Sequence, residues 1–176
     1  MYRPAFAVDS IGDLDPASIP LALACMGDLL LALTSIDRRY MRLYGERIPS
    51  LYSGKFRYRR LPPEPGTTCG DDDWADVITV LEKQRGEGDC EDLACIRAEV
   101  LAERFRIEGA LAYPDLRVAE ERSAFGRIVA ARHDYHVLVR WPETGVARYP
   151  SSVYRAVDRS GRSILLEDPS RVLGMR

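Results

Sequence analysis

The stretch Gly88–Leu101 constrains the fold of this chain more than any other, because it opens as a turn and continues as a helix. Its first residue is a glycine, and Asp89 is a residue type that caps helix N-termini through its carboxylate. Apolar residues then recur at helical spacing, at Leu93, Ile96, Val100 and Leu101. We therefore expect an amphipathic helix that begins at residue 90 and turns one face to a core.

Cys90 falls at the first position of this expected helix, where the positive end of the helix dipole favours a thiolate. Its neighbours are glycine and acidic residues rather than apolar ones. Cys95 lies between Ala94 and Ile96, as is typical of a cysteine that packs as a small hydrophobe. The sequence thus predicts a nucleophilic Cys90 and an inert Cys95.

The composition is that of an ordinary globular protein, with 176 residues, 46% of them hydrophobic and 30% charged. A net charge of −2 gives no reason to expect nucleic acid or an anionic membrane as a partner. The four cysteines show neither disulfide nor zinc spacing. No signal peptide is apparent, and no apolar run is expected to reach membrane-spanning length. We expect a soluble protein of a reducing compartment.

The N-terminal part is predicted to consist of one long helix. Proline and glycine interrupt residues 1–20, whereas residues 21–44 show helical periodicity up to Gly45 and Pro49. The expected apolar stripe of this helix comprises Leu21, Cys25, Leu29, Ala32, Leu33 and Ile36.

A proline- and glycine-rich segment, residues 46–73, predicts a long loop with at most one short strand, in Lys55–Arg60. Long loops of this kind often line a binding site. Three aspartates at its end, residues 71–73, lack the ligand spacing of a calcium loop. They are better explained as the acidic first turn of a helix over Trp74–Lys83.

Beyond the cysteine helix the pattern changes to strands. Tyr113-Pro114 marks the expected end of the first strand, and residues 117–131 indicate either a strand or an excursion. The expected strands are residues 109–115, 135–141, 146–149 and 163–167. Helices followed by an antiparallel sheet predict the α+β class.

A cysteine nucleophile needs a base, and histidine has a suitable pKa. The chain has two histidines, of which His136 lies within a predicted strand and His133 precedes it in a loop-like segment. We predict His136 as the base. Asp168 follows the predicted strand over residues 163–167 and can orient the imidazole.

Three blocks of sequence resemble the transglutaminase-like (papain-like) cysteine protease superfamily: Gly-Asp-Cys-Glu-Asp-Leu-Ala, His-Val-Leu-Val-Arg and Glu-Asp-Pro-Ser-Arg-Val-Leu-Gly-Met. The resemblance covers residues 70–175 and is greatest with small phage- and prophage-encoded members. It implies a helix, with the nucleophile at its N-terminus, packed on an antiparallel sheet. The family's nucleophile, base and acid fall on Cys90, His136 and Asp168. Because the interval from His136 to Asp168 is longer than is usual in the family, Asp158 stays an alternative acid.

The resemblance also implies a function and a domain division. It implies acyl transfer on amide bonds through a thioester, as a peptidase, amidase or transglutaminase, without metal or organic cofactor. The oxyanion would bind the backbone N–H of Cys90 and a second donor, from Trp74 or Gln84. Residues 1–50 would be a helical extension and residues 51–176 the catalytic domain.

The substrate implied is a protein, peptide or peptidoglycan-type amide, with neither nucleic acid nor membrane as a partner. Phage virion or assembly proteins are further partners implied by the resemblance. The location implied is the host cytoplasm or the virion. A catalytically inactive structural or virion-assembly protein with the same fold stands as the alternative.

Overall fold

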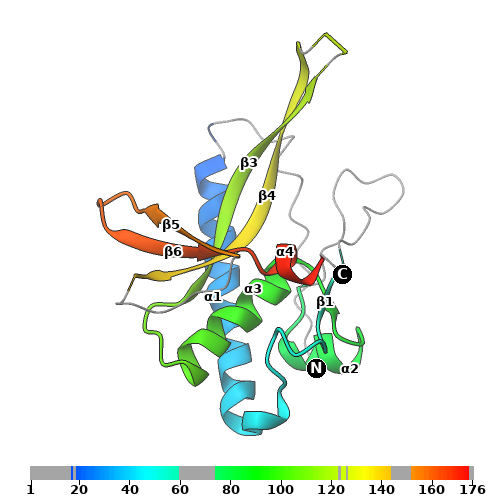
Figure 1. Ribbon diagram of the computed structural model, residues 1–176, viewed down its shortest axis with the longest axis vertical. Coiled ribbons are helices and arrows are strands. Elements are labelled where there is room, and N and C mark those ends of the chain that lie inside the picture. Colours follow the sequence, from blue (N-terminus) through cyan, green and yellow to red (C-terminus); the bar gives the residue numbers. More distant parts are fainter. Residues whose placement is uncertain are drawn as a thin grey trace.

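The computed structural model describes Ala17 and residues 19–59, 74–122, 124–125, 127–143 and 152–174, without the side chains of residues 116–122 and 128–135. Figure 1 shows the elements in order. They are α1 (Ile19–Tyr44), the turn η3 (Gly45–Arg47), β1 (Arg57–Tyr58), α2 (Val77–Glu82), β2 (Glu87–Gly88), α3 (Cys90–Glu99), the turn η4 (Val100–Arg104), β3 (Leu111–Arg122), β4 (Ile128–Pro142), β5 (Val153–Val157), β6 (Ser163–Glu167) and α4 (Pro169–Leu173).

A four-stranded antiparallel sheet in the order β3-β4-β6-β5 forms one side of the molecule. Helices α1 and α3 pack on it, and β3 and β4 extend beyond the body as a two-stranded ribbon (Figure 1). The core between these layers contains Leu30 of α1, Ala94 and Ala98 of α3, and Val139 and Trp141 of β4. The protein is therefore α+β with an N-terminal helix, as the sequence predicts. The division at residue 50 stays a prediction.

Helix α3 is buried on every side rather than amphipathic. All residues from Glu91 to Glu99 are buried, the charged ones included. Neighbouring elements supply the ionic partners, since Arg38 of α1 forms a bidentate pair with Glu99 at 2.8 and 2.9 Å. The prediction of a single apolar face is wrong because α1, α2, α4 and the sheet all contact α3.

The buried face of α1 differs from the predicted stripe. Leu21 and Ile36 are 69% and 45% exposed, and Cys25 is also exposed. Leu33 of the predicted stripe is buried. The other buried residues of α1 are Ile19, Met26, Leu30, Thr34, Asp37 and Met41. Because apolar residues occur on more than one side of α1, periodicity alone does not identify its core face.

Helix α1 with the following turn, Ile19–Arg47, is long and apolar enough to cross a membrane by length and composition. The expectation that no apolar run reaches this length is therefore wrong. In the fold, Leu30 and Leu33 of this helix pack in the core beside α3 and the sheet. A core helix meets the same length and composition criterion.

Strand β3 continues through Pro114, where the sequence predicts an end. Pro114 pairs with Val137, and the pairing runs on to Arg122 opposite Ile128. Because β3 is an edge strand, it has only one partner to bond, and an edge tolerates a residue without an N–H. Residues 117–122 and 128–131 are thus the distal part of the β3–β4 ribbon.

The other predicted strands meet with different outcomes. The strands over residues 135–141 and 163–167 are confirmed as parts of β4 and β6. The return strand expected over residues 146–149 lies outside the described residues. Strand β5 (Val153–Val157), which pairs with β6, is missed by the sequence analysis.

The strand and the helix predicted before α3 are both present, and the helix is shorter than predicted. The short strand expected in Lys55–Arg60 is β1, which pairs in parallel with β2. Helix α2 begins at Val77 rather than at Trp74, and Asp76 caps it by accepting the N–H groups of Ile78 and Thr79. Residues 71–73 lie outside the described part of the chain.

Asp37 links α1 to the start of α2. Its side chain is fully buried, and its Oδ1 accepts the N–H of Val77 at 2.7 Å. Burial raises the pKa of Asp37 well above its usual value. The unfolded chain therefore releases this proton at a lower pH than the folded protein does.

This linkage predicts a pH dependence. The stability contributed by protonated Asp37 is complete below about pH 3.9 and is lost as the pH rises through the folded pKa. We expect Asp37→Asn to reduce the fall in the free energy of unfolding between about pH 4 and 7. Urea denaturation at a series of pH values measures this slope, with Asp28→Asn on the exposed side of α1 as control. A slope equal to that of the wild type would contradict the assignment.

Candidate active site

Cys90 is the first residue of α3, and only Asp89 separates it from the two-residue strand β2. Asp89 occupies the N-cap position, but its carboxylate makes no capping hydrogen bond, contrary to expectation. The carboxylate of Asp92 instead accepts the backbone N–H of Asp89, together with that of Ala75 at 2.7 Å. This is the second half of a capping box, and it holds the start of α3 against the segment before α2.

His136 and Asp168 contact each other through their side chains. His136 Nε2 lies 2.9 Å from Asp168 Oδ1, and the two side chains are 14% and 2% exposed. The pairing of Val139 with Glu167 brings the end of β6 beside β4, so the residue after β6 reaches His136. The structure thus joins two of the three residues that the sequence predicts as catalytic.

Ser170 is a further member of this group that the sequence analysis misses. Its hydroxyl donates to Asp168 Oδ1 at 2.5 Å and lies 3.3 Å from His136 Nε2. Ser170 belongs to α4, which starts at Pro169. The only sequence signal for it is its position two residues after Asp168. The Ser170 hydroxyl thus holds the Asp168 carboxylate in addition to the contact from His136.

Cys90 approaches the histidine strand through the backbone. The backbone of Val137, the residue after His136, forms a hydrogen bond with the Cys90 thiol. Cys90 also packs against the core cluster that contains Val137. No hydrogen bond joins the thiol to His136 in the described part of the chain. With Nε2 turned to Asp168, Nδ1 is the His136 nitrogen left to face a nucleophile.

The environment of Cys90 favours the thiol over the thiolate. Burial raises the pKa of Cys90, and the neighbouring Glu91 raises it further by its charge. The thiol donates to Glu91 Oε2 at 3.0 Å, and Glu91 is itself buried. Burial and a like charge thus oppose the helix dipole, which by itself favours the thiolate at this position.

The other residues considered from the sequence lie elsewhere. Asp158 accepts hydrogen bonds from Ser160 and Arg162 within its own turn, and these bonds lower its pKa. Among the described contacts none joins Asp158 to His136. His133 pairs with Val118 in the β3–β4 ribbon, and its side chain lies outside the description.

Both candidate oxyanion donors lie on the N-terminal side of Cys90 in the chain. Trp74 packs against the same core cluster as Cys90, and its buried Nε1 has no partner in the described chain. Gln84 lines a pocket with Gly88 and Asp89, and its buried Oε1 likewise lacks a partner there. Unpaired buried polar atoms are costly in a folded protein. Both side chains therefore have hydrogen-bonding capacity to spare.

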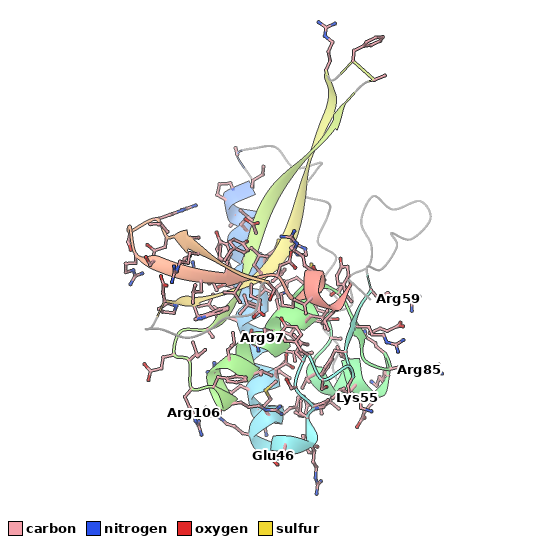
Figure 2. All side chains as sticks on the ribbon, in the orientation of Figure 1. Glu46, Lys55, Arg59, Arg85, Arg97 and Arg106 are labelled. Carbon is pink, nitrogen blue, oxygen red and sulfur yellow. The ribbon has the colours of Figure 1, made fainter. Side chains whose placement is uncertain are left out.

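A buried ion pair connects the cysteine helix to the aspartate strand. Figure 2 shows Arg97 in the interior, and its Nε donates to Glu167 Oε2 at 2.7 Å. Tyr52 donates its hydroxyl to Glu167 Oε1 at 2.7 Å, and the Arg97 guanidinium lies 4.9 Å from the Tyr52 ring centroid. Glu167 directly precedes Asp168. The pair thus fixes the strand end that carries the carboxylate bound to His136.

Among the described residues, no three acidic, histidine or cysteine side chains gather in a way that could hold a metal ion. Comparison with protein-family models, with curated proteins and with solved structures finds no match for this chain. The proposed function therefore rests on the sequence and the geometry of this chain.

Proposed function

We propose that this protein performs cysteine-dependent acyl transfer on amide bonds, with Cys90 as nucleophile, His136 as base and Asp168 as orienting acid. The observation that carries the proposal is the 2.9 Å contact between His136 Nε2 and Asp168 Oδ1. A histidine whose far nitrogen is held by a carboxylate has a fixed tautomer and orientation, as a general base requires. We propose a transglutaminase-like core as the fold that provides this arrangement.

The position of the nucleophile also supports the proposal. Cys90 begins a helix, and the Val137 backbone that contacts its thiol belongs to the strand of His136. In the proposed reaction, the Cys90 side chain turns its thiol from Glu91 toward His136 Nδ1 to make the nucleophile–base contact. Hydrogen bonds of this kind are often long or misaligned without substrate.

The reaction follows from these roles. His136 Nδ1 takes the proton of the Cys90 thiol as sulfur attacks the amide carbonyl carbon. The oxyanion binds the backbone N–H of Cys90 and a side-chain donor, from Trp74 or Gln84. His136 then passes its proton to the leaving amine, and a thioester remains. Water or a second amine attacks the thioester and gives a proton to His136. The bond between the carbonyl carbon and the sulfur then breaks, and His136 returns the proton to restore the Cys90 thiol.

Hydrolysis is our first choice over transamidation. We propose an amide of a protein, a peptide or a peptidoglycan-type polymer as substrate, and no metal or organic cofactor. Phage virion or assembly proteins are the proposed partners, in the host cytoplasm or the virion. The sequence blocks that resemble the transglutaminase-like superfamily support this assignment.

A second function is favoured by one observation. The Cys90 thiol is directed at Glu91, and burial raises its pKa, as in an unreactive structural cysteine. In that case the protein would be a structural or virion-assembly component that keeps the fold without activity.

Alkylation by iodoacetamide, mapped cysteine by cysteine across pH, separates the two functions. If His136 takes the thiol proton, Cys90 is expected to react well below the free-thiol pKa of about 8.5, and His136→Ala should abolish this reaction. Cys25 is exposed on α1 and provides an internal reference. Labelling of Cys90 no faster than Cys25, and unaffected by the histidine change, would favour the structural protein.

Glu91→Gln provides a matched arm of the same experiment. The Glu91 charge raises the pKa of the Cys90 thiol, so its removal should move the labelling profile of Cys90 to lower pH. The profile of Cys25 should not move.

A further inference from the structure

A pocket of about 390 Å³ opens on the N-terminal side of Cys90. Gly88 and Asp89, the two residues before the cysteine, form part of its wall, together with Gln84. Three cations, Arg59, Lys83 and Arg85, also line this space, which we call the rim pocket. Figure 2 shows Arg59 and Arg85 on the same side of the molecule.

Among the described residues, a counter-charge is paired with one of the three cations. Arg59 is neutralised by Glu87 at 2.7 Å. Lys83 and Arg85 are exposed and form no ion pair with any described residue. Two cations that line one pocket, and that no described carboxylate pairs, give this part of the surface a positive potential that attracts anions.

The acidic residues of the rim pocket do not cancel these cations one for one. The Asp92 carboxyl faces inward, accepts the N–H of Ala75 at 2.7 Å, and is 2% exposed. Burial raises its pKa well above the usual value, which favours the neutral form. With Glu87 bound to Arg59, Asp89 is the remaining acidic residue among the described residues that line the rim pocket.

Gln84 adds a neutral recognition group between the cations. Its Oε1 is buried without a partner in the described chain, so it can accept one N–H from a ligand. Its amide nitrogen is a separate donor and stays available to an oxyanion. A carboxylate and an N–H at neighbouring positions are the features of an amino-acid residue with a free carboxylate.

We propose that the rim pocket binds a carboxylate-bearing residue next to the scissile amide, with Lys83 and Arg85 on the carboxylate and Gln84 Oε1 on the N–H. This inference rests on the proposed function, because it assigns the pocket to the same substrate. The carboxylate is that of an acidic side chain or of a chain terminus, which share this chemistry.

The first test compares anionic iodoacetate with neutral iodoacetamide as alkylating agents of the intact protein. For Cys90, the ratio of the two rates, normalised to Cys25, should exceed one and should fall about three- to tenfold in Lys83→Ala/Arg85→Gly. Glycine is chosen because Arg85 has a φ of 56°, a backbone conformation that glycine adopts readily. Lys55→Ala, an exposed cation that does not line the pocket, should leave the ratio unchanged.

The second test uses small ligands to protect Cys90 from iodoacetamide. N-acetylglycine presents a terminal carboxylate, the α-amide of N-acetylaspartate presents a side-chain carboxylate, and N-acetylglycinamide is the neutral control. Protection by either acid, and by neither in the double variant, supports the proposal and identifies the source. Equal protection by the neutral compound, or a rate ratio insensitive to the double variant, overturns it.

The two proposals fail in different ways. If His136→Ala removes the reactivity of Cys90 while the rate ratio is indifferent to Lys83 and Arg85, the acyl-transfer function stands and the rim pocket is excluded. If the ratio depends on these cations while Cys90 reacts no faster than Cys25, the anion site stands and the proposed function fails.

Discussion

Replacing Glu167 with leucine is expected to lower the free energy of unfolding by about 3–5 kcal/mol. The change leaves the Arg97 guanidinium, which is only 8% exposed, buried without its carboxylate. It also removes the acceptor of the Tyr52 hydroxyl. An unpaired buried charge is costlier than the net contribution of the intact pair, since desolvation is no longer offset. Urea denaturation followed by circular dichroism measures the loss.

Two controls show whether charge burial is the cause. Replacing both partners, Arg97→Met with Glu167→Leu, should recover much of the stability that the single variant loses. Arg155→Met breaks an exposed ion pair with Glu143 and should cost less than about 1 kcal/mol. A single variant at Glu167 as stable as the wild type would show that the pair contributes nothing to holding α3 against β6.

Cys90→Ala is expected to lower kcat/KM for amide cleavage by at least about 10⁴-fold while the protein stays folded. The reason is that Cys90 supplies the sulfur of the proposed thioester, whereas an alanine at a half-buried helix start removes little packing. Amine release from casein or peptidoglycan, and incorporation of monodansylcadaverine into casein, measure hydrolysis and transamidation separately.

Cys95→Ala is the matched control, because it deletes the same type of atom five residues further along the chain. Cys95 is fully buried and its sulfur lies 3.6 Å from the Leu30 carbonyl, so activity should stay largely unchanged. Circular dichroism of both variants confirms that the fold is retained. Equal activity of the wild type and Cys90→Ala would contradict the mechanism.

Local sequence determined where most regular elements lie. Helical periodicity places a long helix over residues 21–44, and the structure has it as α1. Glycine followed by aspartate places a helix start at Cys90, and alternating β-branched residues place strands over residues 135–141 and 163–167. These signals succeed because backbone preference, capping and side-chain alternation depend on residues close in the chain.

Tertiary structure alone decided what surrounds those elements. The core face of α1 depends on where α3 lies, and the full burial of α3 depends on four neighbouring elements. The Arg97–Glu167 pair joins residues 70 positions apart, so no local pattern indicates it. The state of the Cys90 thiol follows the same rule. The helix N-terminus favours a thiolate, but the desolvation that opposes it arises only once the whole chain has packed around the sulfur.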